Sequence, residues 1–417
     1  MPKKSTPPGK KLTVFIPEGF TDLQCTQCGD CCRTPPRITI SAAKRDRLLR
    51  ALRDAEFHYA ARDAVMRDED DPDGPATFAL VGERCVFLTD EGRCYLCETG
   101  VPELRGPWCL SFPVSPIVTP RGVDYAVSFA CPETARRLRS KKPLNILALT
   151  LSGEQLPAAE RAFTARHRIP SVGARPKLDW TAHRLVEGML LAIARDWRIN
   201  LTSRLMVMPV MLNHLLRHYA GPGSDAALRE QVSRVVRGLG QAVREGRALR
   251  PDPEAHYEAL ASIFGRRTGL RSRATLRRVI ESALRQVRGR RTKVKSSELG
   301  AALARIYAKR YKPRASQFEH VLGNYVICRT FANAEMLSGG VYKGVYVVCY
   351  LVALIRFFAA TAAAQRGKRV TQKLLLESVR TTEKLFAQSR NLFDFLDSPD
   401  EQRRMLDPAY AAALVRL

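Results

Sequence analysis

Residues 25–32 read Cys-Thr-Gln-Cys-Gly-Asp-Cys-Cys, which places four cysteines within eight positions. Nine of the eleven cysteines precede residue 132. So dense a group indicates either a disulfide network or a metal site. Residues 1–8 (Met-Pro-Lys-Lys-Ser-Thr-Pro-Pro) lack the apolar core of a secretory signal, so we expect a cytoplasmic protein with reduced thiols. The two-residue gaps let successive sulfurs face one centre, and Gly29 lets the backbone bend around it. The sequence therefore predicts a metal site.

The spacing of these cysteines does not select the metal. Four thiolates saturate one zinc ion or one iron–sulfur cluster, and eight would serve two such sites, or one site and a reactive group. The ferredoxin pattern C-x2-C-x2-C-x3-C-P matches three cysteines and then fails, because Cys32 directly follows Cys31. No histidine pair stands at zinc-finger spacing. Iron–sulfur and zinc both stay open.

The charge of the chain is the second strong signal. The formal net charge is +27, and residues 229–314 contain 23 Lys and Arg against 7 Asp and Glu. An excess of this size favours an acidic partner, namely nucleic acid, an acidic protein or an anionic membrane face. A basic surface that is only solvated explains the same charge without any partner.

Composition and hydrophobic patterning divide the chain into four parts and predict a mainly α fold. We expect a flexible basic arm over residues 1–19 and a small cysteine-rich α+β domain with short hairpins over 20–135. A linker is expected over 136–177, followed by an all-α domain over 178–417 that is basic over 229–314. Because the core of this last domain needs no cysteine ligand, we expect it to fold without the metal.

Local patterns place elements within these parts. Ser41 is a suitable N-cap for a helix over about 42–62. Apolar residues on both sides of short turns predict one hairpin near residues 85–97, which brings Cys85 close to Cys94, and another over 116–129.

One stretch of the helical part is apolar enough to raise the question of a membrane. Residues 344–364 contain a single charged side chain, Arg356. Because that charge lies inside the stretch, together with two tyrosines and a cysteine, a buried central helix of a bundle explains it better. We expect no membrane span.

Four stretches of the N-terminal part resemble the cysteine-cluster (CxxCxxCC) zinc- or iron-chelating domain family over about residues 20–135. They are residues 25–32, Cys85-Val86-Phe87-Leu88, Gly92-Arg93-Cys94-Tyr95 and Cys109-x2-Phe112-Pro113. The layout is most similar to the flagellin lysine-N-methylases of bacteria, which pair this domain with a long helical region. Residues 318–325 (Phe-Glu-His-Val-Leu-Gly-Asn-Tyr) and the closing helices resemble the C-terminal part of that family.

This resemblance implies a [4Fe–4S]-type iron–sulfur cluster or zinc, and S-adenosylmethionine-dependent methylation of lysines in a flagellin-like protein. Carried over by motif, the implied metal ligands are Cys25, Cys28, Cys31, Cys32, Cys85, Cys94, Cys109 and Cys131. Three positions depart from the family pattern. Leu110 stands where the family has arginine, Gly106-Pro107 replaces an Arg-Pro closer to Cys94, and Cys97 is an extra cysteine, either a spare ligand or an ordinary thiol.

Other residues have simpler interpretations. Trp108 and Phe112 flank Cys109 and are expected to shield the sulfurs from water. Cys328 and Cys349 lie in apolar helical runs and are expected in the core. His214 and His218, four residues apart, lack a third partner and are expected to be structural.

Two functions of different classes remain. The first is a metal-cluster protein that methylates protein lysines. The second is a non-enzymatic module that a metal stabilises and whose basic helices bind nucleic acid or an acidic protein. No catalytic residue is assigned from the sequence.

Overall fold

The structure is a computed structural model that describes residues 11–415 except 24, 34, 36–37, 55–56, 58–60, 68–74, 152–162, 165–177, 218–224, 249–251, 266–271, 289–293, 333–335, 337–339, 388–395 and 406. Most of the expected linker, the first half of the expected arm and His218 therefore lie outside the described residues.

The described residues form a five-stranded sheet in the order β10-β7-β8-β1-β9. Its strands are β1 (Leu12–Pro17), β7 (Val114–Thr119), β8 (Gly122–Val127), β9 (Ile146–Leu151) and β10 (Phe163–Thr164). β7 and β8 form the hairpin expected over 116–129, with Val114 opposite Val127. β1 and β9 come from segments expected to be arm and linker. β1 runs parallel to β8 and antiparallel to β9, so it is hydrogen-bonded on both sides.

Gly122 explains how β8 comes so close to β1. Its φ is +144°, and a Cβ added there would lie 2.2 Å from the carbonyl oxygen of Thr13. Only glycine fits this approach.

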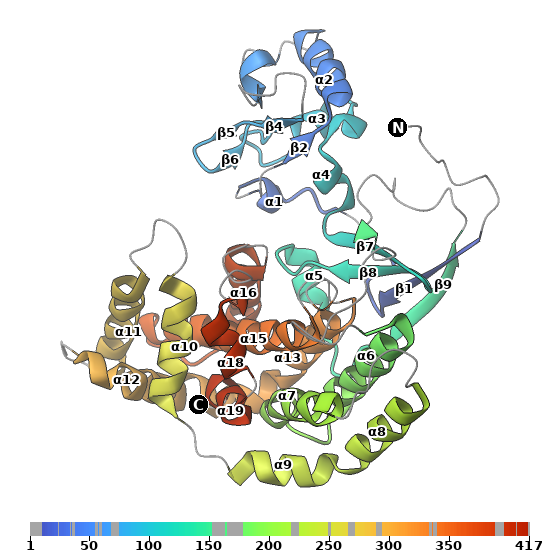
Figure 1. Cartoon of the computed structure of the whole chain (residues 1–417). Helices are drawn as coiled ribbons and strands as arrows, with labels where there is room; N and C mark the ends of the chain where they lie inside the picture. The colour runs from blue at the N-terminus through green and yellow to red at the C-terminus, as the bar shows by residue number, and fades with distance from the viewer. Residues whose placement is uncertain are drawn as a thin grey trace.

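The cysteine-rich module occupies residues 30–111 and lies above the sheet and α16 in Figure 1. It contains a three-stranded sheet in the order β2-β4-β3 and the β5-β6 ribbon. α2 ends at Asp54, eight residues before the expected end. The elements are α1 (Asp30–Arg33), β2 (Thr39–Ile40), α2 (Ala42–Asp54), η1 (Ala61–Ala64), β3 (Val65–Met66), β4 (Ala76–Phe78), β5 (Leu80–Val81), β6 (Arg84–Cys85), α3 (Tyr95–Glu98), η2 (Pro102–Leu104) and α4 (Pro107–Ser111).

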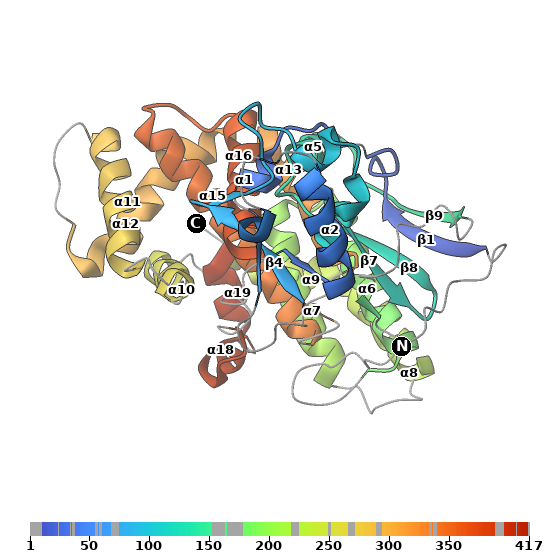
Figure 2. The ribbon, with the colours of Figure 1, turned by 90° about the horizontal axis from the view of Figure 1, so that it is seen from above.

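The rest of the chain is helical, as expected, and the fold is mainly α. The helices α10, α11 and α12 lie at one end of the molecule, and β1 and β9 lie at the other (Figure 2). The elements are α5 (Pro132–Arg137), α6 (Trp180–Arg195), α7 (Leu201–Arg217), α8 (Asp225–Arg237), α9 (Leu239–Ala248), α10 (Pro253–Gly265), α11 (Ser272–Arg288), η6 (Ser296–Glu298), α12 (Leu299–Ile306), η7 (Tyr307–Tyr311), η8 (Lys312–Arg314), α13 (Ala315–Thr330), α15 (Val341–Gln365), α16 (Gln372–Thr382), η9 (Glu383–Ala387), α18 (Pro399–Arg404) and α19 (Pro408–Val415). The sequence patterns had not indicated α12.

α15 is the central helix of this region. It is the one described helix long and apolar enough to cross a membrane, yet 83% of its most apolar window is buried inside the protein. Arg356 donates to the carbonyl of Val415 at 2.7 Å and to the hydroxyl of Thr202 at 3.1 Å. The helix is apolar on all sides because protein surrounds it. The expected buried bundle helix is confirmed; the compartment stays a prediction.

Two large apolar cores and a small third cluster around Ile117 and Phe331 hold the described part of the chain together. The larger contains the helices and also the five-stranded sheet, including Val14, Ile16, Val127 and Phe129. The smaller lies within the cysteine-rich module, between Ile38 and Leu104. The sheet therefore shares its core with the helices rather than with the cysteine-rich module.

A buried histidine makes the stability of this core depend on pH. His256 is 2% exposed, its Nδ1 lies 3.1 Å from the carbonyl of Ala413, and burial lowers its pKa to about 4. The unfolded chain binds the proton at a pKa of about 6.5, so the stabilisation is complete above pH 6.5 and is lost as the pH falls toward 4.

We expect His256→Asn, which keeps an N–H for Ala413, to flatten the fall in the free energy of unfolding between pH 6.5 and 4 by up to about 3 kcal/mol. Denaturant unfolding at several pH values measures this difference. An unchanged pH dependence would show that the imidazole is already charged in the folded protein.

Candidate functional site

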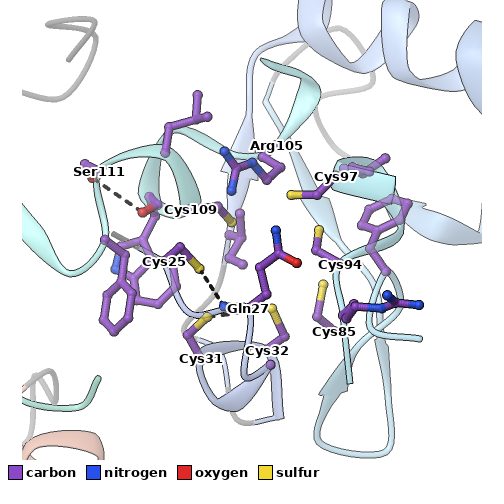
Figure 3. A pocket seen from close by; sticks show the side chains of 18 of the residues that line it. Cys25, Gln27, Cys31, Cys32, Cys85, Cys94, Cys97, Arg105, Cys109 and Ser111 are labelled. Atoms are coloured by element: carbon purple, nitrogen blue, oxygen red, sulfur yellow. Dashed lines mark hydrogen bonds between the residues drawn. The ribbon is translucent and has the colours of Figure 1, made fainter. Parts of the chain in front are cut away.

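A cavity of about 480 Å³ in the cysteine-rich module gathers most of the N-terminal thiols. Figure 3 shows their side chains around it, with Gln27 between them. Six of the eight predicted ligands line it, and the extra cysteine joins them: Cys25, Cys31, Cys32, Cys85, Cys94, Cys97 and Cys109. The prediction that Cys85 and Cys94 lie close together agrees with this placement, although residues 95–98 form a helix instead of a second strand.

The turn at residues 27–29 brings the first cysteines to the cavity. Gly29 has a φ of +66°, and a Cβ there would lie 2.1 Å from the carbonyl oxygen of Gly92. Glycine is thus required both for the left-handed conformation and for contact with the 89–93 turn. The backbone N–H of Gln27 donates to the sulfur of Cys25 at 3.4 Å.

Two predicted ligands lie outside the lining of the cavity. Cys28 is exposed, and Cys131 is the N-cap residue of α5. Burial raises the pKa of the Cys131 thiol, and the negative charges of Cys28 and Cys31 act in the same direction. Neither of these two cysteines is among the residues that line the cavity.

Four thiols of the cavity, those of Cys32, Cys85, Cys94 and Cys109, have raised pKa values and hold their protons tightly. Burial raises the pKa of Cys85 to about 11 and that of Cys94 and Cys109 to about 12, and neighbouring thiols add to each shift. The sulfurs of Cys31 and Cys32 lie 3.8 Å apart. A hydrogen bond between them lowers the pKa of Cys31 to about 7 and raises that of Cys32, because a second negative charge would lie beside the first.

This donor set fits a thiophilic metal by its chemistry. A bound cation would offset the repulsion between thiolates and displace their protons, so metal affinity would rise with pH. Among the residues that the structure describes, no three His, Cys, Asp or Glu side chains stand ready around one ion. The thiols share a cavity, and whether they bind zinc or an iron–sulfur cluster stays a prediction.

Other side chains of the cavity were not predicted. Arg93, Glu98 and Arg105 bring charge to it, and the Arg93 guanidinium lies 2.6 Å from the Glu98 carboxylate. Trp108 and Phe112, expected to shield sulfur, line it as a pair with ring centroids 4.5 Å apart. No spacing rule points to the charged residues, since they reach the cavity only through the folding of the 89–105 segment.

The remaining sequence expectations concern residues far from this cavity. Cys328 and Cys349 are buried in the large core, as expected. His214 is exposed, and nothing described joins it to a metal. Much of the basic segment 229–314 forms α8, α9 and α11, and its binding to nucleic acid or an acidic protein stays a prediction.

The residues quoted for the C-terminal resemblance connect the helices to the chain just after Cys131. Asn324 is fully buried; its side chain accepts from the N–H of Leu144 at 3.1 Å and donates to the carbonyl of Ser140 at 2.9 Å. The hydroxyl of Tyr325 donates to the buried carboxylate of Glu383 at 2.7 Å.

The comparison with protein families bears on this helical part. Residues 188–414 match the model of the FliB lysine N-methylase C-terminal domain, which is more than half of the chain. No curated protein and no solved structure matches the chain. The match begins after the cysteine-rich module, so the resemblance of that module to the chelating family stays a prediction, while the relation to the flagellin lysine methylases is supported. The chain belongs to the family of the FliB lysine N-methylase C-terminal domain.

Proposed function

We propose that the protein methylates lysine side chains of a flagellin-like protein and that the reaction takes place at the cysteine-lined cavity. The single observation that carries this proposal is the union, in one chain, of a FliB lysine N-methylase C-terminal domain and a cavity lined by seven thiols. S-adenosylmethionine would supply the methyl group. A metal centre held by the cysteines would assist the transfer of that methyl group from S-adenosylmethionine.

The cavity offers groups that suit a lysine side chain. Among the described residues that line it, Glu98 is the only carboxylate. A carboxylate can hold the ε-ammonium group and accept the proton that lysine must lose before its nitrogen forms a new bond. The paired rings of Trp108 and Phe112 can cover the aliphatic part of the side chain and keep water away. Arg93, the present partner of Glu98, would move aside for the ammonium group.

Direct transfer to protein lysine tests the proposal. Full-length protein purified without oxygen is incubated with flagellin and S-adenosylmethionine, and methylated lysines are located by peptide mass spectrometry. We expect methylation that requires both the protein and S-adenosylmethionine. Metal-replete protein that leaves every lysine unmodified would overturn the proposed function.

We expect Glu98→Gln to slow methylation by about 100-fold or more, because the amide cannot accept the proton. Glu103→Gln is the matched control, since Glu103 lies five residues further on, with its side chain 56% exposed and outside the cavity. Equal rates for the two variants would remove Glu98 from the site while leaving the methylase activity itself intact.

A further inference from the structure

One short stretch of the C-terminal helices contacts both ends of the cysteine array. α1, which begins at Asp30 and contains Cys31 and Cys32, lies on the side of the module that faces α16 (Figure 1). The Asp30 carboxylate accepts hydrogen bonds from the Arg380 guanidinium and from Lys384, whose Nζ lies 3.0 Å from Oδ2. Lys384 also donates to the backbone carbonyl of Asp30 at 3.3 Å.

These charges are largely removed from water. The side chains of Asp30, Lys384 and Arg380 are 20%, 24% and 27% exposed. An ion pair at a fully exposed surface contributes little, whereas a half-buried network with several hydrogen bonds to one carboxylate fixes its geometry. The position of Asp30, between Cys28 and Cys31, is therefore set by the helical domain.

Glu383, which lies between Arg380 and Lys384 in the sequence, holds the other end of the cysteine array, the segment 129–131. It is 1% exposed, and its carboxylate accepts from the backbone N–H of Phe129 at 3.1 Å, in addition to the hydroxyl of Tyr325. Phe129 is fully buried and precedes Cys131 by two residues. Removing a carboxylate from water costs several kcal/mol unless it is well paired, so these contacts hold the 129–131 segment firmly.

The local backbone of this stretch departs from a regular helix. α16 passes into η9 at Glu383, where the hydrogen-bonding pattern becomes that of a π-helix. Such wide turns are rare and occur often at functional sites. The change falls between Arg380 and Lys384, the two residues that reach Asp30.

We propose that Arg380, Glu383 and Lys384 are positioning residues that fix the segments 28–32 and 129–131 relative to each other, and so set the arrangement of Cys28, Cys31 and Cys131 for metal binding. The helical domain completes the geometry of the cysteine array, which the cysteine-rich module does not fix alone.

The test measures thiol exposure in metal-free, full-length protein. Each variant is labelled with a thiol-reactive reagent, and peptide mass spectrometry gives the labelling rate of each cysteine. We expect Arg380→Gln/Lys384→Gln to raise the labelling rate of Cys31 by about tenfold, since hydrogen bonds to a charged group are lost, whereas Cys28, which is already exposed, should keep its rate. Cys328, buried in the large core, should keep its rate and so report that the fold is intact.

Two further variants separate positioning from general destabilisation. Lys384→Arg keeps the charge and should label like the wild type. Arg403→Gln, which removes an exposed ion pair with Asp400, should also leave the rates unchanged. Glu383→Gln should raise the labelling rate of Cys131 more than that of Cys28. If Glu383→Gln unfolds the protein, the labelling rates of the Arg380→Gln/Lys384→Gln variant still test the proposal. Wild-type labelling in that double variant, or an equal rise in Arg403→Gln, would overturn the proposal.

A spectroscopic measurement tests whether Arg380 and Lys384 affect metal binding. Cobalt(II) added to the metal-free protein gives sulfur-to-cobalt charge-transfer absorption when thiolates bind it. We expect the double variant to bind cobalt(II) about tenfold more weakly than the wild type, and Lys384→Arg to bind it equally well. Equal cobalt(II) affinity in the wild type and the double variant would contradict a role in metal binding. Neither readout involves methyl transfer, so failure of the proposed methylase activity and failure of this inference are distinguishable.

Discussion

Replacing Cys94 by serine is expected to abolish stoichiometric metal binding and to unfold the cysteine-rich module. Cys94 lines the cavity, and burial and the neighbouring Cys97 thiol raise its pKa to about 12. Thiols with such pKa values become good ligands only when a cation replaces their protons. For small metal domains, ligation energy is also folding energy, and it reaches about 10–16 kcal/mol for structural zinc. Loss of one ligand should therefore remove most of the stability of residues 38–104.

Metal analysis and sulfide analysis of protein purified without oxygen measure the first effect, and hydrogen exchange of residues 38–104 measures the second. Cys328→Ala is the control, because Cys328 is buried in α13, in the other core. Stoichiometric metal in Cys94→Ser, or equal metal loss in Cys328→Ala, would contradict a metal centre at this cavity.

A fragment of residues 178–417 is expected not to fold, although the sequence alone suggested that it would. The core of its helices continues into β1 and β8 through Val14, Ile16, Val127 and Phe129. Without the sheet, α6 and α13 lose apolar contacts: Trp180 and Leu191 of α6 pack on the cluster around Ile117 of β7, and the Tyr325 ring of α13 lies 5.3 Å from that of Phe129. Because each buried aliphatic side chain contributes about 1.5–3 kcal/mol, losing several of these contacts exceeds the stability of a typical domain.

The matched control removes the other core instead. A Cβ added to Gly106 would lie 2.2 Å from Cγ2 of Ile38, so residues 38 and 106 lie side by side. The segment between them can therefore be deleted and replaced by a short Gly-Ser linker. We expect this shortened chain to unfold cooperatively on heating, and the 178–417 fragment to bind an apolar dye and melt without a transition. A cooperative 178–417 fragment would show that the helices are a complete domain.

The sequence by itself determined the class of the fold and the gathering of thiols at the N-terminal end. Helical periodicity is a local property, and α15 (Val341–Gln365) contains the whole apolar stretch 344–364 from which a buried helix was predicted. The apolarity of α15 also predicted its burial, because an internal Arg356 is tolerated in a protein core where a carbonyl and a hydroxyl receive it. The density of cysteines predicted that thiols would gather, and six of the eight named ones line one cavity.

Only the tertiary structure decided how these parts are joined. β1 and β9 are as long as β7 and β8, but no short turn joins either of them to a neighbouring strand, and they become strands because β8 and each other supply their hydrogen bonds. Cys97 lines the cavity because the folded 89–105 segment places it there, whereas Cys131 does not, and the spacing of the cysteines does not predict this difference. Arg380, Glu383 and Lys384 lie some 350 residues from Asp30. Their contacts with the cysteine segments arise from packing between distant parts of the chain, and no local pattern encodes such contacts.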